Sequence, residues 1–292
     1  MAVDNSLAAT ATKRPPLPST GSSGKRAEER LKRYKEAQKI RESWESMWQE
    51  CYDYSMPNRS GFWEDDVRGS KNTDDILDST AVHALTDFTS RIKSGVVPDG
   101  SRWVDLKPGP DVQPEDMEDA SAGLESITTN VFEALLDSNA SSETDEAITE
   151  MSIGTGLLHV ADGGIEAPYR FTAIPLSEVW INQGPFGAID EVYRRMKPKA
   201  EDIKIRWPDA QIPRELATII EKEPRRPIEL IESTSRNWKS EEIEYKHEIL
   251  WKEAPAIIWE KDLKGEGSNP WVVFRWAKGA GEVWGRGPLL ST

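Results

Sequence analysis

Histidines are the first side chains to consider for chemistry, because imidazole is the commonest metal ligand in proteins. The chain has three: His83 falls in a stretch with helical spacing, whereas His159 and His247 fall in strand-like stretches. No His-x-x-x-His spacing or His-Glu pairing suggests a metal site. The single cysteine, Cys51, excludes a cysteine-based metal cage. We therefore expect packed or surface histidines and no bound transition metal.

Clustered carboxylates are the second candidate, since their oxygens bind Ca²⁺ and Mg²⁺. Glu64, Asp65 and Asp66 lie together in a polar loop, but the spacing of an EF-hand loop is absent. Carboxylates are so numerous that none stands out as half of an acid–base pair, which needs neighbours that separate two pKa values. We expect no metal at this loop and no catalytic pair.

Motifs for covalent catalysis and nucleotide binding are also missing. The sequence contains neither a Gly-x-Ser-x-Gly elbow nor a phosphate loop of the Gly-x-x-x-x-Gly-Lys-Ser/Thr type. Gly154-Thr155-Gly156 comes nearest to a glycine-rich turn, but it lacks the lysine and precedes a strand, whereas a phosphate cradle follows one. The sequence therefore predicts a protein that is not an enzyme and that has no catalytic residues and no cofactor.

Twelve tryptophans are the remaining chemical feature of the chain. Six of them crowd the expected C-terminal strands: Trp238, Trp251, Trp259, Trp271, Trp276 and Trp284. Such rings can stack on nucleic-acid bases. Without interleaved basic residues, core packing or a subunit interface is the better interpretation.

Charge is distributed unevenly along the 292 residues. The net charge of −14 disfavours a protein whose main task is gripping nucleic acid. Residues 13–41 nevertheless hold ten Lys or Arg against three Glu, whereas residues 108–169 hold fourteen Asp or Glu and no Lys or Arg. The acidic block would repel phosphates over roughly a Debye length, ~8 Å at physiological salt. No apolar run could span a bilayer and the N-terminus lacks a signal-peptide core, so we expect an intracellular origin.

Helical periodicity dominates the first half of the chain. We expect helices over about 25–54 and 73–94, a third opened by Pro114, and a fourth from Ser141 or Ser142 through Ile153. Gly95 is expected just past the second helix, and 101–106 alternates like a short strand. The expected core stripe of the first helix is Ile40, Trp44, Met47 and Cys51, widened by Tyr34, Trp48 and Tyr52. The stripe of the third is Met117, Leu124, Ile127, Val131 and Leu135.

A period of two replaces the helical period from Gly154 onward. The expected strands are 157–161, 169–174, 179–182, 189–196, 228–233, 244–251, 256–261 and 271–276, with helices over 200–207 and 213–223. Helices followed by a meander of strands define an α+β fold with mostly antiparallel pairing. The expected organisation is a disordered tail (1–24), a helical part (25–153) and a β-rich part (154–292). Pro288 signals a helix at the chain end, so we expect a longer parent protein with a helix directly after Thr292.

Four stretches give the chain a resemblance to the N-terminal part of portal proteins, the head-to-tail connectors of short-tailed (podovirus, T7-like) bacteriophages. The first is Trp44 and Trp48 followed by CYDYSMP (51–57), and the second is ILDSTA (76–81) followed by GVVP (95–98) and RWVDL (102–106). The third is GTGLLHV (154–160) followed by AIP (173–175) and GAIDEV (187–192). The fourth is PWVVFRW (270–276) followed by GEVWGRGP (281–288). Trp284 is a departure, because the family more usually has Tyr before Gly-Arg-Gly. The resemblance covers about residues 26–292 and implies a C-terminally truncated portal wing that precedes the stem and clip.

The resemblance also implies a structural role. Family members form a dodecameric ring at one capsid vertex, through which terminase packages the double-stranded genome and from which it is later ejected. The implied partners are further copies of the chain, terminase, tail or adaptor proteins, capsid proteins, and DNA that passes without sequence-specific binding; no membrane is implied. The implied location is the virion, after synthesis in the host cytoplasm.

Two alternatives come from the residues alone. The basic face of the first helix, with Arg30, Lys32, Arg33, Lys35 and Lys39, would suit a nucleic-acid-binding module, although an ordinary solvated face is the simpler interpretation. The clustered carboxylates would suit a metal-dependent hydrolase. Salt-dependent DNA affinity would favour the first alternative, and thermal stabilisation by Mg²⁺ or Mn²⁺ would favour the second.

Overall fold

The computed structural model describes residues 20–59, 61–62, 78–164 and 167–290. Among these residues, the helices that come first are α1 (Thr20–Ser55), α2 (Thr80–Val96), α3 (Met117–Leu136) and α4 (Ala140–Met151). Antiparallel strands follow, so the predicted α+β class is confirmed. Within the described ranges, no helix is long and apolar enough to cross a membrane.

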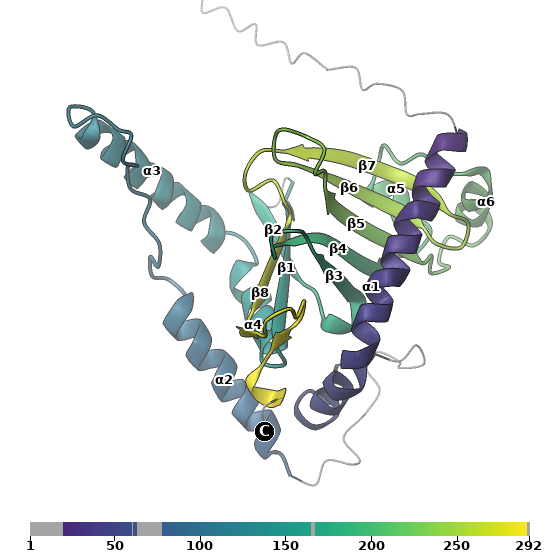
Figure 1. Cartoon of the computed structure of the whole chain (residues 1–292), viewed down its shortest axis with the longest axis horizontal. Helices are drawn as coiled ribbons and strands as arrows, with labels where there is room; N and C mark the ends of the chain where they lie inside the picture. The colour runs from purple at the N-terminus through teal and green to yellow at the C-terminus, as the bar shows by residue number, and fades with distance from the viewer. Residues whose placement is uncertain (1–19, 60, 63–77, 165–166, 291–292) are drawn as a thin grey trace, which may run out of the picture.

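The larger sheet is an antiparallel meander in which each strand pairs with the next one along the chain (Figure 1). Its strands are β3 (Val179–Gln183), β4 (Ile189–Met196), β5 (Leu230–Arg236), β6 (Glu244–Trp251) and β7 (Ala256–Lys264). All five were predicted within a few residues, because each contains β-branched or aromatic residues and ends at a polar or glycine-containing turn or connection. In the β5–β6 register, Thr234 lies opposite His247.

A smaller sheet takes its strands from both ends of the β-rich region. It has the order β2-β1-β8 and consists of β1 (Thr155–Asp162), β2 (Tyr169–Ala173) and β8 (Trp271–Arg275). His159 in β1 lies opposite Thr172 on one side and Trp271 on the other. A short ribbon, β9 (Ala277–Lys278) with β10 (Gly285–Arg286), follows, and the predicted helix start at Pro288 is a 3-10 turn (Pro288–Leu290).

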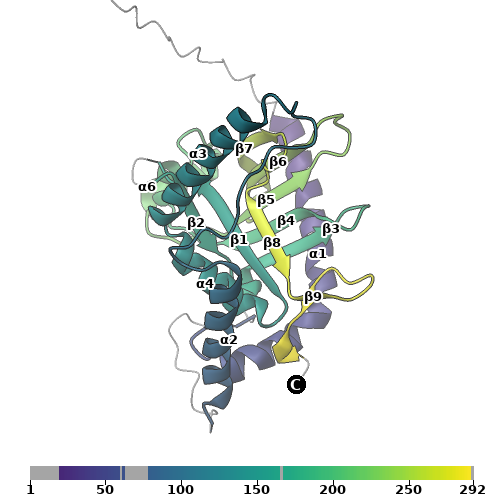
Figure 2. The same cartoon turned by 90° about the vertical axis from the view of Figure 1, so that its left-hand side faces the viewer.

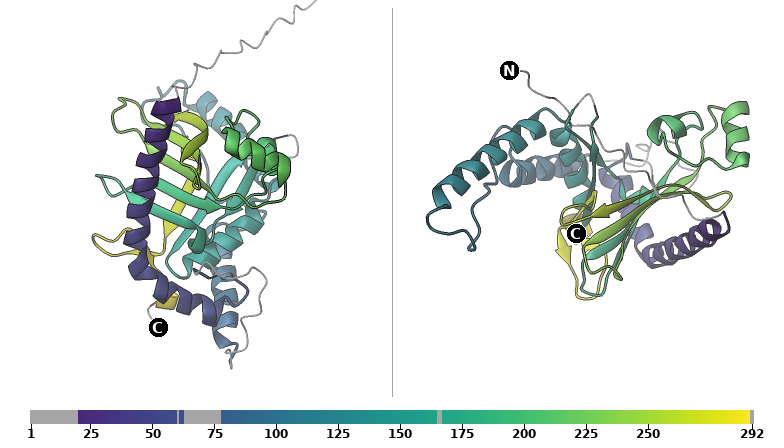
Figure 3. Two further views of the ribbon diagram at one scale, coloured as in Figure 1. Left: turned by 90° about the vertical axis from the view of Figure 1, so that its right-hand side faces the viewer. Right: turned by 90° about the horizontal axis from the view of Figure 1, so that it is seen from above.

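Helix α1 crosses one face of the five-stranded sheet, whereas α5 (Asp202–Arg206) and α6 (Arg214–Lys222) cover the other (Figure 3). Successive side chains of a strand point to opposite faces of the sheet, so neighbouring residues belong to two different hydrophobic cores, one under α1 and one under α5 and α6. Ile231 and Leu250 pack under α1, while Leu230 and Ile249 pack with the α5 and α6 residues. A third core joins the end of α1 to the smaller sheet around Trp48, Leu157 and other residues.

The predicted stripe of α1 is displaced by about one position. The buried residues of α1 recur every three, four or seven positions, as one face of a helix requires: Ala27, Tyr34, Ala37, Arg41, Trp48, Tyr52 and Ser55. Trp48 and Tyr52 were expected at the margin of the stripe, whereas Ile40, expected at its centre, is 47% exposed. The central position that the prediction missed is Arg41, a charged residue in the core.

Helix α4 packs against β1 and β2, and α2 packs against α4 (Figure 2). Helix α3 projects away from the sheets (Figure 1). The predicted strand 101–106 is wrong, because the segment is extended but unpaired and lies along α3. There Leu106 donates its backbone N–H to Thr128 Oγ1, and Trp103 meets Phe132 edge-on with ring centroids 5.6 Å apart. We call residues 101–136 the arm.

The predicted core stripe of α3 is wrong for three of its five residues, whereas Leu124 and Leu135 are half-buried. Met117, Ile127 and Val131 are exposed, and the buried residue of this helix is Thr128. Helix α2 ends at Val96, so Gly95 lies inside it and not beyond it, and α3 begins at Met117, three residues after the predicted Pro114.

Candidate functional site

The spacing of the three histidines along the chain suggested that they lie apart, but two of them lie close together. His83 is exposed on α2, but His159 and His247 meet Glu232 of β5 between the two sheets. One ligand atom from each of these three residues lies within 4.8 Å of the other two. The expectation of no metal rested on the absence of a ligand cluster, and that premise is wrong. The loop that holds Glu64, Asp65 and Asp66 lies outside the described residues.

Both imidazoles of this histidine–glutamate cluster face the same carboxylate oxygen. His247 Nε2 lies 3.3 Å from Glu232 Oε1, and His159 Nε2 lies 3.7 Å from it. The other oxygen, Oε2, lies 3.7 Å from Arg194 Nη1. All three cluster residues are at most 9% exposed, so the carboxylate and both rings are shielded from bulk water.

Burial and neighbouring charge set the protonation of this cluster. Burial lowers the pKa of His159 to about 4, since a charged ring would be poorly solvated there. Burial alone would raise the pKa of Glu232, but hydrogen bonding to His247 and the neighbouring histidine and Arg194 charges hold that pKa at about 2. At neutral pH the cluster therefore presents a neutral His159 and an ionised Glu232, which are the forms that ligate metals.

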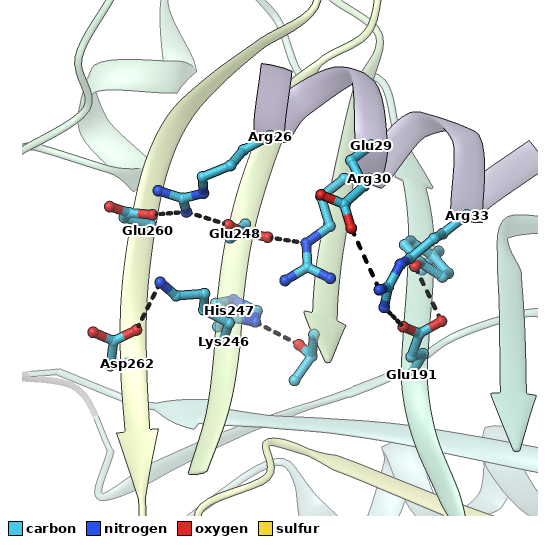
Figure 4. Close-up of polar contacts among 12 residues, drawn as sticks. Arg26, Glu29, Arg30, Arg33, Glu191, Lys246, His247, Glu248, Glu260 and Asp262 are labelled. Carbon is cyan, nitrogen blue, oxygen red and sulfur yellow. Dashed lines mark hydrogen bonds and ion pairs between the residues drawn. The ribbon is translucent and has the colours of Figure 1, made fainter. Parts of the chain in front are cut away.

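A ladder of ion pairs joins α1 to the sheet on the opposite face (Figure 4). Arg26 Nη2 and Arg30 Nε each lie 2.6 Å from the fully buried carboxylate of Glu248. Arg26 also binds Glu260, and Arg33 Nη1 lies 2.7 Å from Glu191 Oε1. Arg30 and Arg33 of the predicted basic face thus bind carboxylates of their own sheet, whereas Lys32, Lys35 and Lys39 are exposed.

This ladder borders a hollow of about 360 Å³ that is rich in positive charge. Its basic lining residues are Arg26, Arg30, Arg33, Arg236, Lys239 and Lys246. Trp238 closes one side; its ring lies under the Arg236 guanidinium at 4.1 Å, and its Nε1–H donates to Asp190 at 2.7 Å. The alternative of a nucleic-acid module has its best physical support here, at the rim and not on the helix face.

The predicted tryptophan group divides between core and surface. Trp251, Trp271 and Trp284 are at most 5% exposed, in agreement with core packing. Trp238 and Trp276 are 41% and 45% exposed. The arm adds further exposed apolar side chains: Trp103, Val104, Leu106, Met117, Ile127, Val131 and Leu136. Exposed apolar side chains on one segment of this kind are a frequent feature of interaction surfaces.

The α+β fold and the exposed apolar arm can now be set beside known proteins. The chain matches the profile of the family described as "Bacteriophage head to tail connecting protein" over residues 27–291, and it belongs to that family. The predicted resemblance is confirmed. It is also similar to the "Probable portal protein" of Bordetella phage BPP-1, with 24% identity over 284 residues. The alignment covers 89% of this chain and 48% of that protein, so the chain spans about half the length of this relative.

Sequence reasoning missed Glu232, although one signal pointed to it. Strand β5 contains the run Glu232-Ser233-Thr234-Ser235, four polar residues within a strand that is buried on both faces. Buried polar side chains need partners, so such a run indicates polar groups on the neighbouring layers. His159 could not be added from this signal, because the contact of β1 with β5 and β6 joins two separate sheets.

Proposed function

We propose that the chain forms part of a portal subunit, a structural and non-enzymatic component of the ring through which phage DNA is packaged and ejected. The ring is a homo-oligomer, dodecameric by family resemblance, at the portal vertex of the virion, and the subunit is made in the host cytoplasm. Its partners are terminase during packaging, tail or adaptor proteins, capsid proteins and double-stranded DNA. Within it, the helical part of the wing runs from α1 to residue 153 and the β-rich part covers 154–292. Helix α1 begins at Thr20, inside the predicted tail over 1–24, and residues 1–19 lie outside the described residues.

The observation that carries this proposal is the family match over residues 27–291. The arm supports it further, because its exposed apolar residues would be covered by a neighbouring subunit in a closed ring. An acidic block that faces the channel would let DNA pass without binding, since exposed carboxylates such as Glu118 and Glu133 of α3 repel phosphates; the outside of the ring is equally compatible with these charges.

Native mass spectrometry of the intact protein that carries this chain tests the proposal. We expect one closed oligomer of fixed copy number at moderate salt, and a ring with a central channel by electron microscopy. Ile127→Lys places a charge on the exposed apolar face of the arm and should weaken assembly while leaving the melting temperature of the subunit unchanged. Thr129→Lys, an exposed position of the same helix outside that apolar set, is the matched control.

Two outcomes would contradict the proposal. An intact protein that stays monomeric or dimeric at every salt concentration tried is not a portal ring. A chain that binds DNA with a steep salt dependence, and loses that binding when Lys239 and Lys246 at the rim of the basic hollow are replaced by glutamine, is a nucleic-acid-binding module.

A further inference from the structure

The histidine–glutamate cluster is buried between the two sheets, and its geometry points to a role outside the proposed portal function. We propose that His159, Glu232 and His247 bind one Zn²⁺ ion per chain. The ligand atoms are the Nε2 atoms of the two imidazoles and Glu232 Oε1, and the ion ties β1 of the smaller sheet to β5 and β6 of the larger one. This proposal goes beyond the portal function and stands independently of it.

The distances suit zinc. Ligand atoms about 2.0–2.1 Å from a tetrahedral Zn²⁺ lie about 3.3–3.4 Å from one another. The His247–Glu232 separation is 3.3 Å and the His159–Glu232 separation is 3.7 Å, so two edges of the tetrahedron are nearly formed. All three ligand atoms lie within 4.8 Å of one another, so the third edge, between the two imidazole nitrogens, shortens when the ion binds. Three protein ligands leave the fourth position for water.

An unsatisfied atom marks the place of the ion. His159 Nε2 is buried and has no hydrogen-bond partner among the described residues. Buried nitrogen atoms of this kind nearly always have a partner, so its lone pair calls for one. The two rings are nearly parallel, at 22° with centroids 6.1 Å apart, so both flank the same carboxylate oxygen. A cation between the rings and Oε1 would use all three donors together.

The surrounding residues orient the ligands as the neighbours of bound metals do. His247 Nδ1 lies 2.6 Å from Thr234 Oγ1, and Trp271 Nε1–H donates to the same hydroxyl at 2.9 Å. The ion would take the place of the proton between His247 Nε2 and Glu232, with His247 Nδ1 carrying the ring proton and donating it to Thr234 Oγ1. Arg194 Nη1 lies 3.7 Å from Oε2 of Glu232, whereas both imidazoles face Oε1. Its positive charge opposes the ion, and the carboxylate of Glu178, 3.9 Å from Arg194 Nε, offsets it.

Zinc is favoured over magnesium or calcium because two of the three donors are imidazoles, whereas those hard cations take oxygen ligands. A water molecule held by the same three residues is the competing occupant, since the site is polar and buried. The two occupants differ in one measurable way, because only the metal site saturates with added ion.

The test uses the 292-residue chain after treatment with a chelator and dialysis. Titration with Co²⁺, a spectroscopic substitute for zinc, should give the strong visible absorption of a tetrahedral site and saturate at one equivalent, and Zn²⁺ should displace it. The melting temperature should rise with free Zn²⁺ concentration. His159→Gln should abolish both effects, and Thr234→Val should weaken Zn²⁺ binding about 10–100-fold through its effect on His247.

His83→Gln is the matched control, because it removes an exposed histidine on α2 and should leave the cobalt spectrum and the affinity unchanged. Circular dichroism establishes that each variant is folded, and the unaltered chain tests the site even where a variant is not. No saturable tetrahedral cobalt spectrum from the unaltered chain would overturn the proposal and leave water as the occupant. Equal loss in His83→Gln and His159→Gln would also overturn it.

Discussion

Glu248 on β6 is fully buried, and Arg26 of α1 binds its carboxylate at 2.6 Å across 222 positions of sequence. Arg30, one helical turn later, binds the second oxygen at the same distance. Two guanidinium groups on one helix face therefore fix where α1 crosses the sheet. A buried charge that loses its partners is far more costly than the ion pair is favourable, because the remaining charge has neither water nor a counter-ion.

The first prediction follows from this asymmetry. Replacing both arginines, Arg26→Met and Arg30→Met, should lower the free energy of unfolding by about 3–5 kcal/mol, since Glu248 would stay buried without a cation. Glu248→Gln should cost less, because both arginines are partly exposed and can reach water. Urea denaturation monitored by tryptophan fluorescence measures both. Greater loss from Glu248→Gln than from the double variant would contradict this account.

A second prediction concerns the aromatic pair that joins the two ends of the chain. Trp48 of α1 and Trp284 are almost fully buried and meet edge-on, with ring centroids 4.8 Å apart. Trp284→Ala should lower the free energy of unfolding by about 3–5 kcal/mol, because it leaves a large cavity. Trp276→Ala is the control; its ring is 45% exposed and contacts Phe88, so about 1 kcal/mol is expected. Similar losses in both variants would show that Trp284 is not a core residue.

Local patterns predicted most of the elements but not the contacts between them. Strands β3 to β7 could be located because each alternates and each is joined to the next by a short connection or a helical excursion. The stripe of α1 was displaced because Arg41 is buried at 2% exposure, and charged residues are expected outside. Its guanidinium lies over the Trp180 ring at 4.0 Å and donates to the carbonyls of Leu176 and Val179 at 2.7 Å.

The histidine–glutamate cluster could not be predicted for a related reason. His247 and Glu232 lie on adjacent strands, so their proximity follows once β5 and β6 are paired. His159 comes from a different sheet, whose central strand pairs with β8 from the far end of the chain. Spacing along the sequence carries no information on such a pairing, because register is set by the cores on both sides of the strands. The exposed stripe of α3 was misjudged similarly, since periodicity shows an apolar face without showing what covers it.

A third prediction concerns pH and the buried carboxylate of Glu150. It accepts hydrogen bonds from the Tyr52 hydroxyl at 2.6 Å and the Leu176 N–H at 3.0 Å, and it lies 3.3 Å from Arg59 Nε. Burial raises the pKa of Glu150 above its ordinary value of 4.5, although Arg59 and Tyr52 oppose the shift. The folded protein therefore holds this proton more tightly than the unfolded chain. Its contribution to stability is present below about pH 4.5 and is lost as pH rises through the folded pKa.

Glu150→Gln carries no charge at any pH, so its stability relative to the unaltered chain should rise with pH above about 4.5. Urea midpoints measured across that window test this. Glu146→Gln is the control, because Glu146 is an exposed carboxylate that binds the same Arg59, and its loss should change stability by less than about 1 kcal/mol. A relative stability of Glu150→Gln that falls with rising pH would reverse the assigned sign.

A fourth prediction uses two glycines where backbones from distant parts of the chain nearly touch. A Cβ on Gly285 would lie 2.1 Å from the carbonyl oxygen of Gly154, which itself adopts a φ of +148°. The Gly285 N–H also donates to Thr155 Oγ1 at 3.0 Å, so the strand cannot move aside freely. Gly285→Ala should therefore lower the free energy of unfolding by about 1–3 kcal/mol, as overpacking does.

Gly123→Ala is the opposite case, because Gly123 lies inside α3 with nothing within 4 Å of an added Cβ. That change should stabilise the chain by about 0.5–1 kcal/mol, since alanine loses less backbone entropy in a helix. Thermal and urea unfolding of the two variants should thus give shifts of opposite sign, and equal shifts would mean that the Gly154–Gly285 approach does not constrain the fold.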